Sequence, residues 1–146
     1  MSAKLVLDID AMQEEFFNDT SLIGIVSALP AYRFCWLLNE RFDLHLKREG
    51  ESDICLKTNQ NISHYFALYR YDVPMNSNHF SVYKLKNNKQ ALLPELKQLD
   101  YLFMIQGPTA ESDAEKYMEA LRQINDIQLA QVIKPEKLKN MDYLLL

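Results

Sequence analysis

Two apolar runs, each followed by a helical pattern and then by a second strand pattern, constrain the fold of this chain most strongly. The run SLIGIVSAL at 21–29 is continuous and apolar, which is typical of a strand buried on both faces. After Pro30, apolar residues recur at helical spacing and predict one buried helix face: Ala31, Phe34, Cys35, Leu38 and Phe42. The segment DLHLKR at 43–48 alternates with period two, so the first unit is predicted to be strand, helix, strand.

The second unit begins with DYLFMIQ at 100–106, again a pattern typical of a strand buried on both faces. Gly107-Pro108 ends this strand, and the acidic residues that follow favour the positive end of a helix dipole. Ser112 and Glu115 have the spacing of a capping box. The predicted buried helix face consists of Ala114, Tyr117, Met118 and Leu121. DIQLAQVI at 126–133 then predicts the closing strand.

The middle of the chain predicts an antiparallel hairpin. ISHYFALYRY at 62–71 and HFSVYKLK at 79–86 both alternate with period two and are separated by a turn-rich segment. The predicted fold class is therefore α+β: a mainly antiparallel sheet with two helices on one face, built from ferredoxin-like βαβ units around a central hairpin. We expect one domain over residues 1–146, with a further short strand at 4–9.

Composition and charge narrow the classes of function. The net charge of −4 and the isoelectric point near 5.4 argue against a large basic surface for duplex nucleic acid. No window approaches the roughly 18 apolar residues that cross a bilayer, and the N-terminus lacks the pattern of a signal peptide. We therefore expect a cytoplasmic protein with no membrane partner, in which Cys35 and Cys55 are reduced thiols.

No group of residues predicts catalysis, a metal or a cofactor. Asp8 and Asp10 could share a magnesium ion, but such a pair is more typical of the exposed face of an edge strand. The three histidines lack metal-ligand spacing, and neither cysteine lies in a nucleophile motif. Gly107 before a helix could hold a phosphate, but phosphate loops usually carry several glycines, and the acids that follow repel an anion.

Tyrosines on the predicted hairpin are candidate binding residues. Tyr65, Tyr69 and Tyr71 are expected on one strand face, with Tyr83 across the hairpin, which would form a half-exposed aromatic surface. Tyrosine is enriched in contact surfaces, but the same pattern also serves cross-strand packing or lies beneath a helix. Packing is the more common of the two roles, and both readings stay open.

The stretch LPELKQLDY at 93–101 predicts a corner. Leu93, Leu96 and Leu99 would fall on one side of a tight turn that starts at Pro94, which suits a segment that packs into the core while the chain changes direction. Glu95 and Lys97 would lie on the solvent side. A structural corner is the favoured interpretation, and a contact surface that uses Glu95 and Lys97 is the alternative.

The same stretch resembles the signature of the IPExxVDY family, uncharacterised proteins of Bacteroidota bacteria. Leu93-Pro94-Glu95 matches its beginning and Leu99-Asp100-Tyr101 its end, with leucine in place of both Ile and Val and with an interval one residue longer. Residues 21–48 and the PEKL segment near the C-terminus also resemble the family. The resemblance implies an intracellular protein with no established activity and no catalytic residues.

These observations favour a non-enzymatic cytoplasmic interaction or adaptor protein that binds another protein through its sheet surface or the 93–101 corner. One alternative is a small-ligand regulatory domain that acts as a homodimer, by analogy with ferredoxin-like sheets. Another is an RNA- or ribosome-associated factor, which the acidic isoelectric point opposes. The tyrosines favour it, and so do two lysine clusters: Lys84, Lys86 and Lys89, and Lys134, Lys137 and Lys139.

Overall fold

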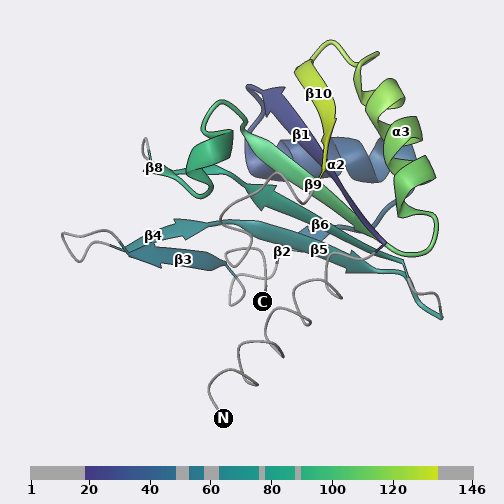
Figure 1. The fold of residues 1–146 in the computed structure, drawn as a ribbon, viewed down its shortest axis with the longest axis horizontal. Coiled ribbons are helices and arrows are strands. Elements are labelled where there is room, and N and C mark those ends of the chain that lie inside the picture. The colour runs from purple at the N-terminus through teal and green to yellow at the C-terminus, as the bar shows by residue number, and fades with distance from the viewer. Residues whose placement is uncertain (1–18, 49–52, 58–62, 76–77, 88–89, 135–146) are drawn as a thin grey trace.

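The computed structural model describes residues 19–48, 53–57, 63–75, 78–87 and 90–134 (Figure 1). Its largest element is a six-stranded antiparallel sheet with the strand order β10-β1-β9-β6-β5-β2. In chain order these strands are β1 (Thr20–Ser27), β2 (Lys47–Arg48), β5 (Leu68–Asp72), β6 (His79–Lys84), β9 (Tyr101–Gln106) and β10 (Ile127–Ile133). Two helices, α2 (Ala31–Phe42) and α3 (Ala110–Leu121), accompany the sheet in the described residues, and the α+β class is confirmed.

The topology consists of two strand-helix-strand units around a hairpin. β9 and β10 both pair antiparallel with β1, so they run parallel to each other with β1 between them and α3 as their connection. β1 and β2 are also parallel, with β9, β6 and β5 between them. The β5–β6 hairpin thus lies inside a ferredoxin-like arrangement, as the sequence predicts.

Both helices pack on the same face of the sheet, which also agrees with the prediction. α2 contributes Phe34, Cys35 and Leu38 to this first core, and α3 contributes its small and apolar residues Ala110, Ala114, Met118 and Leu121. Strand residues of alternating position complete the core, among them Ile23, Phe80 and Phe103. The helical spacing of these residues is therefore what fixes the orientation of both helices.

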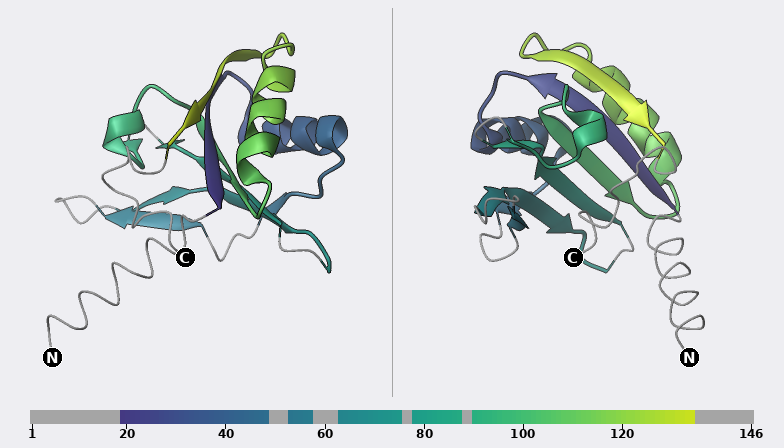
Figure 2. Two further views of the ribbon diagram at one scale, coloured as in Figure 1. Left: turned by 45° about the vertical axis from the view of Figure 1, so that its right-hand side comes forward. Right: turned by 60° about the vertical axis from the view of Figure 1, so that its left-hand side comes forward.

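A second core covers the opposite face of the sheet. It contains the other alternating residues of β1 and β9, such as Leu22 and Leu102, together with Phe66 and Leu93. The covering elements are the small sheet of β3 (Ile54–Lys57) and β4 (Ser63–Phe66) and the 3-10 turn Pro94–Leu96. Figure 2 shows these elements on the side of the sheet that lies away from α2 and α3. Both faces are thus buried, which explains the continuous apolar runs of β1 and β9.

Two predicted strands are shorter or divided in the structure. Only Lys47–Arg48 of the predicted strand 43–48 pairs with a neighbour, because Asp43 adopts a left-handed conformation with φ of 54° at the end of α2. The Asn39 amide then exchanges two hydrogen bonds with the backbone of Leu46, at 2.9 and 3.2 Å, in place of a neighbouring strand. The predicted strand 62–71 is divided at Ala67 into β4 and β5.

The start of α3 also differs from the prediction. Thr109, rather than Ser112, is the residue that precedes the helix, and its Oγ1 donates a hydrogen bond to Asp113 Oδ2 at 2.8 Å. Ser112 lies inside the first turn and donates to the carbonyl of Thr109, so the predicted capping box is wrong. Acidic residues in the first turn are confirmed. The predicted strand at 4–9, with Asp8 and Asp10, lies outside the described residues.

Two glycines lie where the backbone turns or packs closely. A Cβ on Gly24 would overlap the Leu99 side chain and lie 2.6 Å from Ile133 Cδ1, so a larger residue there would displace the ends of these two side chains where β1 meets the 93–99 corner. Gly107 has a φ of 145°, which favours glycine where β9 turns into α3.

Candidate functional site

The predicted tyrosine surface is divided between the two faces of the molecule. Leu68 pairs with Tyr83 and Tyr69 with Val82, so Tyr83 lies on the opposite face of the sheet from Tyr69 and Tyr71. Tyr83 is only 3% exposed and belongs to the second core. The expectation that Tyr83 shares an exposed face with the other tyrosines is therefore wrong, because residues that pair directly across a hairpin share a face and Tyr83 pairs with the buried Leu68.

Tyr71 packs rather than presenting a surface. Its ring is stacked on Phe80, with 6.2 Å between the ring centroids, and forms a T-shaped contact with His45, with 5.4 Å between the ring centroids. The side chain is half-buried against the first core. For Tyr71 the structure therefore agrees with the alternative of packing beneath the helices.

Tyr65 and Tyr69 remain together, in a groove of about 340 Å³ that we call the Tyr65 groove. It lies between the start of α2 and the corner of the sheet formed by β2, β5 and β6. Its lining residues come from five separate segments: Pro30, Ala31, Tyr32, Arg48, Tyr65, Ala67, Tyr69, Lys84 and Asn87. Asn87 fixes one wall, because its Nδ2 donates a hydrogen bond to the Tyr65 carbonyl at 2.6 Å.

Exposed aromatic side chains distinguish this part of the surface. Tyr32 is 67% exposed and Tyr65 58% exposed, and both line the groove. Trp36, 59% exposed, follows Tyr32 by one helical turn on the same outer face of α2. Neither Tyr32 nor Trp36 was predicted from the sequence as a surface residue of the site. Their signal was two aromatic residues four apart on the otherwise polar face of an amphipathic helix.

Burial and charge set the chemistry of the groove. Burial raises the pKa of the Tyr69 phenol, so at neutral pH this side chain is a neutral hydrogen-bonding group. Arg48 Nη2 lies 2.7 Å from Asp53 Oδ2, and Asp53 keeps its side chain largely buried beside the backbone of Leu68. Lys84 supplies a second cation to the lining. The first turn of α2, which lines this end of the groove, carries no acidic residue.

A smaller hollow of about 290 Å³ adjoins the Tyr65 groove, and Pro30 and Lys84 line both. The last residues of the family-like signature lie in its wall. Asp100 Oδ2 accepts a hydrogen bond from the Ser27 backbone N–H at 2.9 Å, and its Oδ1 lies 3.3 Å from Lys86 Nζ. The Tyr101 hydroxyl donates to the Leu29 carbonyl, and its ring stacks on Phe34 at 4.4 Å. These contacts hold the connection that leads from β1 into α2.

The beginning of the same stretch is a structural corner, as predicted. Leu93 is fully buried, and Leu96 and Leu99 pack against the second core. Lys97 is exposed and Glu95 half-exposed. The predicted candidates Glu95 and Lys97 thus lie at a corner that covers the second core, and neither of them lines the Tyr65 groove.

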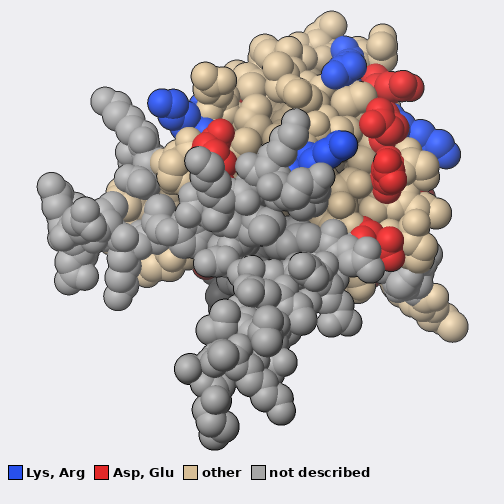
Figure 3. Space-filling view, in the orientation of Figure 1, with Lys and Arg blue, Asp and Glu red and all other residues tan. Residues whose placement is uncertain are grey.

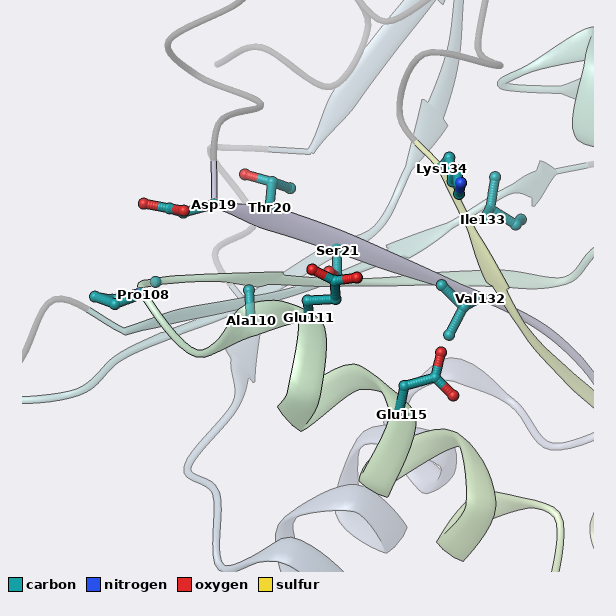
Figure 4. A pocket seen from close by; sticks show the side chains of 11 residues that line it. Asp19, Thr20, Ser21, Pro108, Ala110, Glu111, Glu115, Val132, Ile133 and Lys134 are labelled. Carbon is teal, nitrogen blue, oxygen red and sulfur yellow. The ribbon is translucent and has the colours of Figure 1, made fainter.

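A third hollow, of about 440 Å³, lies between the start of α3 and the ends of β1 and β10. In Figure 4 the Glu111 side chain lies beside Ser21 and the Glu115 side chain faces Val132, whereas Asp19 points away. Figure 3 shows acidic side chains gathered over α3. Acids in the first turn stabilise the positive end of the helix, so this charge has a structural explanation. The described residues contain no group of three or more metal-binding side chains.

Comparison with known proteins identifies no relative from which the function of this site could be inferred. A scan against protein-family models found no match, and searches of curated proteins and of solved structures found no similar protein. Neither helix in the described part of the chain is long and apolar enough to cross a membrane.

Cys35, which is buried, and Cys55, which is exposed, are both free thiols, as predicted.

Proposed function

We propose that this chain is a non-enzymatic cytoplasmic interaction module that binds a segment of a partner protein in the Tyr65 groove. The observation that carries the proposal is the gathering of exposed aromatic side chains, Tyr32 and Tyr65, in the lining of one groove. Tyrosine is enriched at protein contacts because it combines a large apolar ring with a hydrogen-bonding hydroxyl. The free thiols support the cytoplasmic location.

Membership of the IPExxVDY family is part of the proposal. It is supported by the sequence resemblance and by the contacts of Asp100 and Tyr101, which give the end of the signature a structural role. The signature then fixes the β1–α2 connection, and with it Pro30 and Tyr32 in the wall of the groove.

RNA binding is the second candidate function, and one observation favours it. Arg48 and Lys84 lie beside the tyrosines, and proteins that bind single-stranded RNA combine aromatic rings with cations in this way. The homodimeric small-ligand domain stays a prediction that no feature of the described residues favours.

Site-specific photo-crosslinking in cells tests the proposal. A photo-reactive amino acid is placed at position 65, and the control carries it at position 129, where the exposed Leu129 lies on the opposite edge strand of the sheet. We expect a discrete protein adduct from position 65 that survives nuclease treatment and is absent or much weaker from position 129. An adduct that nuclease removes would favour RNA binding instead, and equal labelling from both positions would contradict the proposed site.

A further inference from the structure

Lys84 occupies the junction of the two adjoining hollows. It is the last residue of β6, and its backbone N–H donates to the Ala67 carbonyl at 3.0 Å, where β4 and β5 are divided. Its half-buried side chain lines both the Tyr65 groove and the smaller hollow beside Asp100. A ligand that spans the two hollows would therefore pass Lys84.

The charge of Lys84 is not neutralised by the described residues, in contrast to its neighbours. Arg48 pairs with Asp53 at 2.7 Å, and Lys86 lies 3.3 Å from Asp100. Lys84 forms no ion pair with any residue that the structure describes, and the described lining of the Tyr65 groove includes no acidic side chain. Among the described residues the junction therefore has one positive charge that no ion pair neutralises, which a partner with a negative group would complement.

We infer that the partner segment is a peptide that presents a carboxylate to Lys84 and an apolar side chain to Tyr32 and Tyr65. This inference rests on the proposed function and specifies the chemistry of the partner. The two hollows of about 340 and 290 Å³ suit individual side chains of an extended segment rather than a folded domain. Ligand pockets usually start at roughly 300 Å³, so the groove has room for a few side chains at a time.

The same charges disfavour a nucleic-acid backbone as the occupant. A polyanion gains affinity through many contacts between phosphates and cations, each of which releases counterions. Two of the three cations at these hollows are already paired with carboxylates, so only Lys84 offers a contact that requires no broken ion pair. A single carboxylate needs only one such cation.

Selection from a phage-displayed library of random peptides with the purified full chain tests this inference. We expect enriched peptides to contain Asp or Glu close to an aromatic or aliphatic residue. Lys84→Met should weaken binding of a synthesised enriched peptide by about tenfold, because a charge-assisted hydrogen bond is lost, whereas Lys84→Arg should retain most of the affinity. Lys116→Met, on the exposed face of α3, is the matched control and should bind as the wild type does.

The other outcomes overturn either the acidic-partner inference or the proposed function, and they show which of the two has failed. Enriched peptides without acidic residues, or unchanged binding by Lys84→Met with an unchanged melting temperature, would overturn the acidic-partner chemistry. Failure to enrich any peptide, while position 65 still crosslinks to a protein in cells, would do the same and leave the proposed function intact. Tighter binding of a labelled oligouridine than of any peptide would overturn the inference in favour of RNA. Loss of the crosslink from position 65 would contradict the proposed function itself.

Discussion

At the scale of single residues, the most specific polar contacts connect parts of the chain that are distant in sequence. Asp100 accepts from a backbone N–H 73 residues away, and Tyr101 donates to a carbonyl 72 residues away. Both residues lie in a stretch that the sequence analysis singled out, but their partners Ser27 and Leu29 could not be predicted. Nothing in the sequence marks Ser27 and Leu29 as partners, because they contribute a backbone N–H and a backbone carbonyl, which do not depend on the type of side chain.

The buried phenol of Tyr83 predicts a loss of stability at alkaline pH. Burial in the second core raises its pKa above the ordinary value of 10.0, and the nearby Arg70 opposes this only in part. Because the folded-state pKa is raised, the stability is fully present below the pKa of the unfolded chain and falls above it. For one such group the fall is about 1.4 kcal/mol per pH unit.

Tyr83→Phe should therefore reduce the slope of unfolding free energy against pH, measured by urea unfolding from about pH 9 to about pH 11. Tyr32→Phe, which changes an exposed tyrosine, is the control and should retain the wild-type slope. If both variants show the wild-type slope, Tyr83 is not protected from ionisation in the folded protein.

At the scale of elements, the periodicity of apolar residues predicted the helices and the long buried strands, but not the position at which a strand is interrupted. The helical spacing of α2 and α3 and the apolar runs of β1 and β9 are local patterns, and the structure confirms them. The interruption at Ala67 separates β4, which pairs with β3, from β5, which pairs with β6. This change of partner leaves no period in the sequence, because alternation continues through residues 62–71 on both sides of the interruption.

The corner at 93–99 makes a prediction at this scale. Leu93→Ala should lower the unfolding free energy by roughly 3 kcal/mol, and Leu96→Ala by less, because Leu93 is fully buried and Leu96 only partly. Glu95→Gln should change it much less than Leu93→Ala does, because Glu95 is only partly buried and glutamine keeps a polar side chain of the same size. Denaturant unfolding gives the order of the three effects. A loss from Glu95→Gln as large as that from Leu93→Ala would show that the carboxylate is a structural part of the corner.

At the scale of the whole molecule, one sheet separates two cores and is shared by both. The sequence indicated that β1 and β9 are buried on both faces, and it assigned the helices to one of them. It did not show what covers the other face, because that cover combines β3, β4 and the corner, which come from separate segments. Tyr83 illustrates the consequence. Because the sequence does not show that β3, β4 and the corner cover this face, Tyr83 was predicted to be exposed, whereas the structure buries it.

The shared sheet predicts that the two cores unfold together. Leu102 and Phe103 are neighbours on β9, both fully buried, and their side chains enter opposite cores. Leu102→Ala and Phe103→Ala should each lower the unfolding free energy by roughly 3 kcal/mol or more. In each variant, far-ultraviolet and near-ultraviolet circular dichroism should follow one coincident transition, because neither core retains a complete sheet without the other. Leu129→Ala, at a partly exposed site on the edge strand β10, should shift that transition much less. Two separated transitions in Leu102→Ala would mean that the helix side folds independently of the second core, and that the sheet does not couple the cores.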